Sequence, residues 1–245
     1  MILAIDIGNT TISCGVFRGA RLMRRFDVPT ALATHPVRLT RRLRVGRVQR
    51  AIMCSVVPRA TAAVTQALRA AGVSSVQIVG RTLRVPLRNR YRYPKQVGQD
   101  RLVGAYAAWT TYKRKRACIV ADFGTAITID IVTKAGEYLG GIIAPGMEIS
   151  LEALATRTAL LPKVTLKEPP ELLGRDTANS IRSGIVYGCA ALCDGLVAQL
   201  RRRYAPKAVV VATGGASRLV SRHSRVIDHL RPNLVLEGLF RLSKH

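Results

Sequence analysis

The hydrophobic pattern of the chain begins with short apolar runs separated by polar turns, a spacing typical of β-strands. Residues 1–5 are apolar, a polar turn follows, and residues 12–17 form a second apolar run. A third run at 22–28 predicts that the chain opens with an antiparallel meander. Further strands are expected at 51–57, 73–79, 118–122, 126–132, 138–144 and 208–212.

Helical periodicity alternates with these strands. Pro36 suits the first turn of a helix over 30–43, and Gly72 is expected to end a helix over 59–71. Helices are also expected over 98–112, 147–155, 178–204 and 233–242, and loops over 80–97 and 161–170. This alternation predicts an α/β protein.

The polar turn after the first strand carries candidate chemistry. Gly8 has no Cβ, so backbone N–H groups there can approach an anion, and the hydroxyls of Thr10, Thr11 and Ser13 add donors. Asp6 is well placed to hold Mg²⁺ beside the same phosphates. The alternative is a tight hairpin in which these residues serve only the turn, and the motif alone leaves both interpretations open.

A second copy of the pattern favours the functional interpretation. Residues 118–132 repeat the order of apolar strand, Asp-x-Gly, hydroxyl residue and β-rich strand, with Asp122 matching Asp6 and Gly124 matching Gly8. Such self-similarity predicts a duplicated domain whose two turns face one another across a cleft. The basic break at 113–116 places the expected boundary between a half over 1–114 and a half over 115–245.

Composition indicates a globular cytoplasmic protein. Its 245 residues are 48% hydrophobic, enough for packed cores. No apolar stretch approaches the roughly 20 residues of a membrane-spanning helix, and no basic leader precedes the first strand, so no membrane association is expected. The five cysteines form no close Cys-x-x-Cys pair and are interpreted as buried small hydrophobes in a reducing compartment.

The net charge is unusual. There are 39 Lys plus Arg against 14 Asp plus Glu, which gives +25 and a pI of about 11.3. Such a balance raises nucleic acids and anionic surfaces as partners. The basic residues are nevertheless spread along the chain without an aromatic-interleaved platform or a recognition-helix pattern. Solvated basic faces are the default interpretation, and no specific nucleic acid is expected.

Several motifs together resemble one family, the type III pantothenate kinases of the actin, Hsp70 and sugar-kinase superfamily. The Asp-x-Gly turns and Thr213-Gly-Gly are similar to the whole superfamily, whereas the Gly-x-Asp-Arg element at 98–101 makes the resemblance specific. The motifs are Asp6-Ile-Gly-Asn-Thr, Tyr91 with Pro94, Gly98-Gln99-Asp100-Arg101, Asp122-Phe-Gly-Thr125-Ala, Gly140-Gly141 through Pro145-Gly146, Gly174-Arg-Asp-Thr177 and Thr213-Gly-Gly.

The resemblance implies a fold, an activity and an assembly. The fold would be two ribonuclease H-like, actin-like halves with mixed sheets flanked by helices and a cleft between them. The activity would be ATP-dependent phosphorylation of pantothenate to 4′-phosphopantothenate, the first step of coenzyme A biosynthesis. Mg²⁺ and a monovalent cation, K⁺ or NH₄⁺, would be required, and the active unit would be a homodimer.

The resemblance also implies roles for individual residues. Asp100 would be the catalytic base, because the attacking alcohol must lose a proton. Asp6 would bind Mg²⁺ and Asp122 the monovalent cation. The ATP site would comprise Asp6, Ile7, Gly8, Asn9, Thr10, Thr11, Ile12, Ser13 and Thr125. The pantothenate site would comprise Tyr91, Gly98, Gln99, Asp100, Arg101 and Thr177, the last reaching the site of a partner chain.

Simpler interpretations stand beside these roles. Asp100 could only favour its helix dipole, Thr177 could be an N-cap, Tyr91 could be an exposed loop aromatic, and Asp122 could be a turn residue. Arg101 could clamp the carboxylate of pantothenate or steady a phosphate. The helix over 178–204 is apolar on several sides and must be covered by a partner subunit or by the C-terminal helix.

Two departures from the family pattern matter. Ile127 stands where many relatives carry a second hydroxyl residue, which would weaken a phosphate or cation contact. The heavy arginine content is also unlike the family, and its purpose is open. The alternative function is therefore a catalytically weak actin-fold regulator with a basic nucleic-acid-binding surface.

Overall fold

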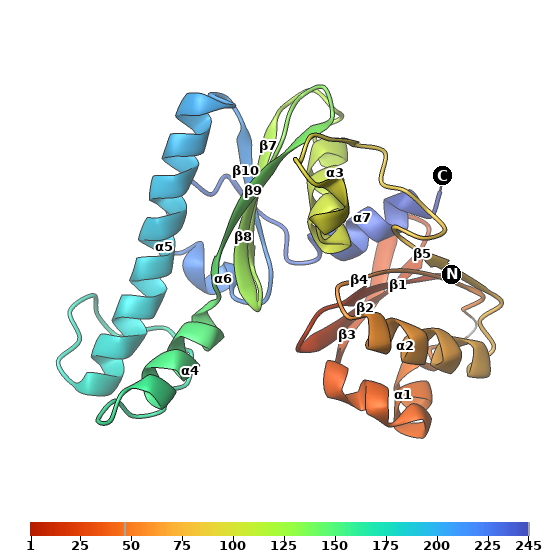
Figure 1. Ribbon diagram of the computed structural model, residues 1–245, viewed down its shortest axis with the longest axis horizontal. Helices are drawn as coiled ribbons and strands as arrows, with labels where there is room; N and C mark the ends of the chain where they lie inside the picture. The colour runs from red at the N-terminus through yellow and green to blue at the C-terminus, as the bar shows by residue number, and fades with distance from the viewer. Residues whose placement is uncertain (47, 245) are drawn as a thin grey trace. The chain divides into compact units, whose positions relative to one another are not determined.

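The chain separates into two compact units in the computed structural model, which describes residues 1–46 and 48–244 (Figure 1). The first unit comprises Met1–Ala107 together with Leu234–His245, and the second comprises Ala108–Asn233. The division differs from the expected boundary after residue 114 in two respects. It falls inside a helix, and the C-terminal helix belongs to the first unit because its apolar face packs on the first sheet.

The first unit is built on one sheet with the strand order β3-β2-β1-β4-β5. In this sheet β1 pairs antiparallel with β2 and parallel with β4. Its five strands are β1 (Ile2–Ile7), β2 (Thr11–Arg18), β3 (Arg21–Pro29), β4 (Arg50–Ser55) and β5 (Ser75–Ile78). The short β6 (Arg88–Asn89) also belongs to this part of the chain but is not a strand of this sheet. The helices are α1 (Pro36–Leu43), α2 (Pro58–Ala70), α3 (Gln99–Thr111), whose last turn enters the second unit, and α7 (Leu234–Leu242).

Opposite faces of the first sheet are covered by different helices. Alternate side chains of β1, β2 and β4 join those of α1 and α2 in one core. Helix α7 packs on β1, β2 and β4. Phe17 stacks on Phe240 at 4.7 Å between ring centroids, and a Cβ on Gly15 would approach Leu236 to 3.3 Å. The period-two alternation of the strands thus supplies two buried faces.

The second unit repeats the strand arrangement of the first. Its strands β7 (Cys118–Phe123), β8 (Ala126–Val132), β9 (Glu137–Pro145), β10 (Val209–Thr213) and β11 (His229–Leu230) lie in the order β11-β10-β7-β8-β9. Counted from the first strand of each unit, both sheets have the order 3-2-1-4-5, with one antiparallel and one parallel neighbour of the first strand. The duplicated ribonuclease H-like fold expected from the sequence is confirmed.

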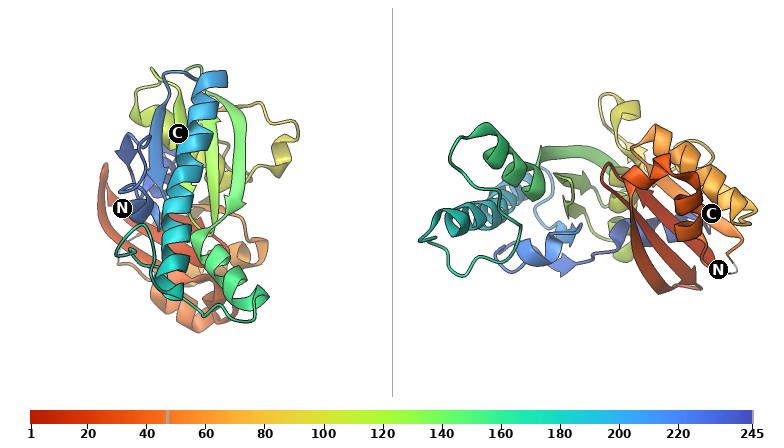
Figure 2. Two further views of the ribbon diagram at one scale, coloured as in Figure 1. Left: turned by 90° about the vertical axis from the view of Figure 1, so that its left-hand side faces the viewer. Right: turned by 90° about the horizontal axis from the view of Figure 1, so that it is seen from below.

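The long helix α5 (Thr177–Arg203) covers one face of the second sheet, as Figure 2 shows. Ala190, Cys193 and Val197 contribute to the core of this unit. Helices α4 (Met147–Arg157) and α6 (Ser217–Val220) contact α5. Helix α7 belongs to the first unit, where it packs on the first sheet.

Helix α5 also differs from the sequence expectation about membranes. It contains a stretch with a mean hydropathy of 1.4, which is apolar and long enough to cross a membrane by composition. The sequence expectation considered only uninterrupted apolar stretches, and Arg182 and Asp194 interrupt the apolar residues of this helix. A single such helix is a weak indication of a span, since helices of protein cores pass the same test.

A few short elements also differ from expectation. The helix expected over 30–43 is divided into a 3₁₀ turn (Thr30–Thr34) and α1, because Pro36 starts a new helix after His35 in an extended conformation. The loop expected over 80–97 contains β6 and a 3₁₀ turn (Pro94–Gln96). The elements α6 and β11 were not anticipated, because they have four and two residues and show no periodicity.

Candidate active site

The first Asp-x-Gly turn lies at the carboxyl end of β1. The amide of Gly8 donates to the carbonyl of Thr11 at 3.0 Å, and a Cβ on Gly8 would lie 3.2 Å from the same oxygen. Thr30 fixes the turn from outside: its hydroxyl donates to the Gly8 carbonyl at 2.7 Å, and its amide donates to the Thr10 carbonyl at 3.0 Å. Sequence reasoning missed Thr30, whose role depends on the pairing of β2 with β3.

The carboxyl group of Asp6 lies in an environment that disfavours its charge. Burial, and secondly the negative charge of Asp100, raise its pKa from 3.8 to about 7. The adjacent strand places Cys54 beside Asp6, and the Cys54 thiol donates to Oδ1 at 3.3 Å. Burial and the nearby Asp6 in turn raise the pKa of Cys54, so the thiol keeps its proton. Cys54 was assigned no role from the sequence.

The residues proposed for the ATP site are not equivalent in the structure. Asn9, Thr10 and Thr11 are exposed at the turn. The side chains of Ile7 and Ile12 are fully buried in the core, so only their backbone is available to a nucleotide.

The Ser13 hydroxyl already has a hydrogen-bond partner within the fold. Its hydroxyl donates to Asp27 on β3 at 2.8 Å, and Asp27 is in turn paired with Arg25 at 3.3 Å. The expectation that Ser13 donates to a phosphate therefore competes with this hydrogen bond.

The start of α3 brings four of the predicted substrate residues together. Asp100 lies in the first turn, and its Oδ1 accepts the Arg101 amide at 2.9 Å. A Cβ on Gly98 would lie 2.4 Å from the same Oδ1, so a larger residue there would displace this carboxyl group. Gln99 packs against Gly80, whose φ of +84° requires glycine, since a Cβ would lie 2.8 Å from Cδ of Gln99. These contacts hold the Asp100 carboxyl close to Asp6.

Tyr91 lies in the loop that precedes α3. Its amide donates to Oδ1 of Asn89 at 3.0 Å, and the Asn89 side-chain amide donates to the Pro94 carbonyl at 3.3 Å. Tyr91 itself is partly buried. Asn89 therefore shapes the loop that carries Tyr91, a role that the sequence did not indicate.

The second Asp-x-Gly turn is closely lined by backbone. Asp122 lies near the end of β7, between Thr128 of β8 and Thr213 of β10. A Cβ on Gly124 would lie 3.2 Å from Oδ1 of Asp122, and one on Gly214 would lie 2.4 Å from it. Gly214 also has a φ of +90°. The Thr-Gly-Gly motif thus permits the backbone to pass directly beside the carboxylate.

Thr125 is exposed at the tip of the same turn. A Cβ on Gly146, at the start of α4, would lie 2.0 Å from the Thr125 carbonyl. The side chain of Ile127 is 2% exposed and belongs to the core of the unit. The sequence predicts that Ile127 weakens the binding of a phosphate or cation. Because this side chain faces the core, a direct effect on such a ligand is not supported.

Thr177 is the first residue of α5 and is exposed. The N-cap is Asp176, whose Oδ1 accepts the Asn179 amide at 2.8 Å and whose Oδ2 accepts the Asn179 side-chain amide at 2.6 Å. These bonds lower the pKa of Asp176, the backbone bond contributing most. Thr177 is not the cap, so the simpler interpretation of this residue is wrong.

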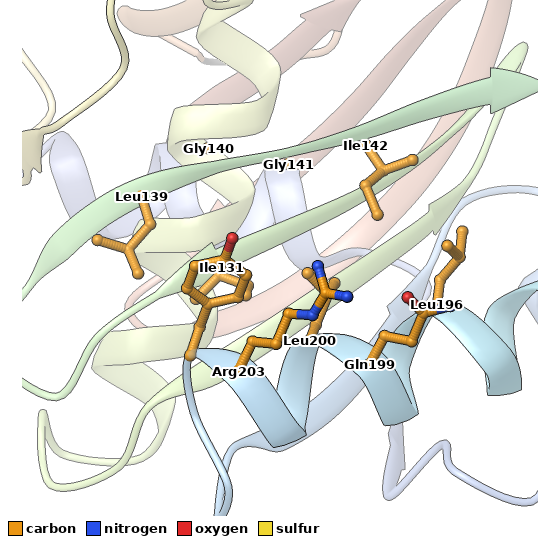
Figure 3. A pocket seen from close by; sticks show the side chains of 10 residues that line it. Ile131, Leu139, Gly140, Gly141, Ile142, Leu196, Gln199, Leu200 and Arg203 are labelled. Atoms are coloured by element: carbon orange, nitrogen blue, oxygen red, sulfur yellow. The ribbon is translucent and has the colours of Figure 1, made fainter.

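Gly140 and Gly141, two glycines of the family motif, lie in β9 opposite Ile131 and Asp130 of β8, away from the second turn. They line a hollow of about 360 Å³ between β9 and the last turns of α5. Figure 3 shows Leu139 and Ile142 pointing toward Arg203 across it. Gly146 of the same motif instead lies beside Thr125, a residue expected in the ATP site.

Cation binding is consistent with the first turn. Among residues 1–46 and 48–244, no group of three or more His, Cys, Asp or Glu side chains could hold a metal ion unaided. Mg²⁺ is commonly held by one or two carboxylates together with substrate phosphates. Asp6, whose charge is destabilised by burial and by Asp100, fits such a partial site because a cation would offset both effects.

Comparisons with known proteins agree with this geometry. A sequence profile of the family described as type III pantothenate kinase matches residues 2–199. A type III pantothenate kinase of Anaeromyxobacter sp. (strain K) is 38% identical, covering 98% of this chain and 97% of its own. One from Dehalococcoides mccartyi (strain CBDB1) is 36% identical, covering 97% and 93%.

Solved structures support the fold. A Baf family protein from Campylobacter jejuni has a TM-score of 0.64 at 16% identity, covering 99% of this chain and 97% of its own. The ethanolamine utilization protein EutJ from Carboxydothermus hydrogenoformans has a TM-score of 0.58 at 15% identity, covering 98% and 89%. The profile and the near-full-length relatives together show that the chain belongs to the type III pantothenate kinase family.

Proposed function

We propose that the protein transfers the γ-phosphoryl group of ATP to the primary alcohol of pantothenate, giving 4′-phosphopantothenate and ADP, with Asp100 as general base. Family membership supports the reaction. The observation that carries the residue assignment is the pair of neighbouring carboxyl groups, Asp6 and Asp100, beside a glycine turn in the same unit. A carboxyl group whose pKa is raised by burial and by a neighbouring negative charge, as that of Asp6 is, is typical of functional sites.

Asp100 is suited to accept the proton of the alcohol. In the proposed step the hydroxyl oxygen forms a bond to the γ-phosphorus, its proton passes to the Asp100 carboxylate, and the bond to the β-phosphate oxygen breaks to release ADP. The Arg101 amide on Oδ1 and the glycine at 98 fix the orientation of the acceptor carboxylate. Positioning of this kind supplies much of the rate in phosphoryl transfer.

The first turn is assigned to the phosphates of ATP. The exposed residues Asn9, Thr10 and Thr11 present backbone and hydroxyl groups, and Thr30 keeps the turn in this conformation. When bound beside Asp6, Mg²⁺ neutralises charge on the β- and γ-phosphates. Cys54 holds one Asp6 oxygen by hydrogen bond, leaving the other to face the cation.

The second turn is assigned to a monovalent cation, K⁺ or NH₄⁺, and to further contacts with ATP through Thr125. The support is the carboxylate of Asp122 surrounded by backbone at Gly124 and Gly214. Oxygen-rich surroundings of this type suit a weakly hydrated cation, which adds positive charge near the phosphates.

The pantothenate site is assigned to Tyr91, Gly98, Gln99 and Arg101 of the same chain. Pantothenate carries a carboxylate, and the guanidinium of Arg101 can bind such a group through two parallel hydrogen bonds. Gln99 is held by its contact with Gly80 and can offer an amide to the substrate. Family membership and the location of these residues beside Asp100 support the assignment.

A homodimer is the proposed active unit, because one side of α5 is exposed among the residues that the structure describes. The exposed positions of this helix are mostly small: Ser180, Gly184, Gly188, Ala191, Gly195 and Ala198. A Cβ at Gly184, Gly188 or Gly195 would meet nothing within 4 Å, so the fold of one chain does not require these glycines. Small residues allow a second copy of the helix to approach closely. Thr177 would then contribute to the partner's pantothenate site.

A coupled assay that follows ADP release with and without pantothenate tests the reaction. We expect turnover that depends on pantothenate, Mg²⁺ and K⁺. Turnover with another alcohol but not with pantothenate would contradict the substrate. Pantothenate-independent nucleotide binding without turnover would favour the regulator alternative.

The shared site has its own test. Asp100→Asn protein and Thr177→Arg protein should each be inactive, and mixing them should restore part of the activity because one site then combines two intact contributions. Light scattering should give the mass of a dimer. A fully active monomer would contradict the assembly. A cytoplasmic location, where the precursors of coenzyme A are available, is part of the same proposal.

A further inference from the structure

A basic hollow lies at the edge of the second sheet where β7 and β10 begin, on a part of the molecule that the kinase reaction does not use. It measures about 270 Å³ and is lined by Arg116, Arg201, Pro206, Lys207, Ala208, Val209, Asp228 and His229. Cys118 and Val209 pair at this edge as the first residues of parallel strands. Within the same unit, Asp122 lies toward the opposite, carboxyl end of β7, so the basic hollow is separate from the second Asp-x-Gly turn.

The turn between α3 and β7 carries four consecutive cations at 113–116, and the last of them, Arg116, lines this hollow. Lys113 and Arg114 have φ values of +53° and +60°, a left-handed conformation that is costly for residues other than glycine. The turn is nevertheless held: the Arg114 amide donates to the Trp109 carbonyl at 3.0 Å, and the guanidinium lies 4.9 Å above the Trp109 ring. The backbone is therefore strained at Lys113 and Arg114, and all four cationic side chains of the turn are exposed.

Two segments distant in sequence bring their cations together here. Arg116 donates to the carbonyl of Lys207 at 3.3 Å, which ties the basic turn to the connection between α5 and β10. Arg201 donates to Asp228 at 2.8 Å. Asp228 is the single acidic residue of the lining, whereas three residues of the lining are cationic. A cluster of like charges repels itself, and a polyanion would relieve that repulsion.

An aromatic surface accompanies these charges. His229 lines the hollow, and its ring lies 5.4 Å from the ring of Tyr112, with a tilt of 34°. The imidazole is therefore backed by a second ring while the residue stays exposed. Cations that follow a phosphate backbone, together with a ring on which a base can stack, are the features that single-stranded nucleic acids bind.

We propose that the basic hollow and the turn at 113–116 bind single-stranded nucleic acid without sequence specificity, in addition to the kinase reaction. Phosphates lie against Arg116, Lys207 and the neighbouring cations, and a base stacks on His229. The sequence did not reveal this site, because its ring and its cations come from three separate segments that only the parallel pairing of β7, β10 and β11 brings together.

The test compares two variants that lose the same charge. The site variant carries Lys113→Gln, Lys115→Gln, Arg116→Gln and Lys207→Gln, all exposed residues of the turn or of the lining. The control variant carries Arg38→Gln, Arg41→Gln, Arg42→Gln and Arg44→Gln, all exposed residues in and just after α1. Fluorescence anisotropy with a labelled single-stranded RNA of about 20 nucleotides, longer than a typical single-strand site, gives the affinity at several salt concentrations.

We expect the site variant to make the slope of log K against log salt less negative by about 3, since about 0.7 counterions are released for each phosphate contact of a single strand. The control variant should change it by less than about 1. Both should retain pantothenate kinase activity, which shows that they are folded. Equal changes in the two variants would overturn the proposal and assign binding to the overall charge of the chain.

The ring has a separate test. His229→Ala should weaken RNA binding several-fold while leaving the salt slope unchanged, because stacking does not release counterions. Duplex RNA of equal length should bind more weakly than the single strand, since its bases are not available for stacking. Tighter duplex binding, or inorganic polyphosphate that binds as tightly as RNA of the same charge, would overturn the assignment to single-stranded nucleic acid.

Discussion

The Asp6 and Asp122 turns are copies of one hairpin, and they differ in what surrounds the carboxyl group. Asp6 faces a thiol and a second carboxyl group, those of Cys54 and Asp100. Asp122 is instead bounded by glycine backbone at 124 and 214. Duplication has therefore kept the strand pairing while the two environments have diverged. This difference supports the proposed division of roles, in which the first turn serves proton transfer and Mg²⁺ binding and the second brings backbone close to a charged group.

Asp100→Asn should produce the largest effect, because it leaves the first turn without its proton acceptor. We expect kcat to fall by about 10² to 10⁴, a range typical of losing a general base. Circular dichroism and ATP affinity should stay close to those of the wild type, since the shape is conserved. A kcat near that of the wild type would reduce Asp100 to a helix-terminal residue.

Gly214→Ala tests the backbone lining of the second turn. A Cβ there would lie 2.4 Å from Asp122 Oδ1 on a residue with a φ of +90°, so we expect a loss of roughly 1–3 kcal/mol of stability and a higher K⁺ requirement. Gly215→Ala is the matched control, because a Cβ at Gly215 meets nothing within 4 Å. Thermal denaturation and K⁺ titration of the rate measure the two effects. Equal behaviour of both variants would contradict the steric argument.

Asp6→Asn should change stability in a pH-dependent way. The native pKa of about 7 lies above the ordinary 3.8, so between these values the native state keeps a proton that the unfolded chain has released. The free energy of unfolding of the ligand-free protein should therefore fall as pH rises through this window. An asparagine at position 6 carries no titrating proton, so the variant should not show this decrease. We expect the variant to be more stable by about 1–2 kcal/mol at pH values above 7 and equal to the wild type below 4, after discounting for solvent screening.

Urea denaturation at several pH values checks this expectation. A wild-type stability that does not change between pH 4 and 7 would contradict it. The same variant should need more Mg²⁺ for half-maximal activity, so stability and function would move in opposite directions.

Exchange of K⁺ for Na⁺ should have the smallest effect. A site lined by the Asp122 carboxylate and backbone would hold the smaller ion less well, and the rate should fall several-fold. Asp122→Asn should remove the difference between the two salts and leave the Mg²⁺ dependence unchanged. Equal rates of the wild type in both salts would remove the monovalent cation from the proposal.

The features that the sequence predicted are those that depend on residues close together in the chain. The two Asp-x-Gly turns, the strands around them and the start of α3 are confirmed, because each depends on residues adjacent in the chain. Cys54 and Thr30 were not predicted, since only strand pairing brings them to the first turn. Asp176 was not predicted as the N-cap of α5 because the expected start of the helix was displaced by one residue. The helix begins one residue earlier than its apolar pattern, which is a common uncertainty of helix ends.

The placement of α7 on the first sheet has a consequence for synthesis of the chain. The Arg241 guanidinium donates to the Ala107 carbonyl at 2.7 Å, Arg50 donates to the Ser243 carbonyl at 3.0 Å, and Gly238 leaves room for Val103. The unit whose strands leave the ribosome first therefore lacks one of its covering helices until the second unit has been synthesised. The second unit is continuous and can complete its core earlier. Until α7 follows, one apolar face of the nascent N-terminal sheet has no helix to cover it.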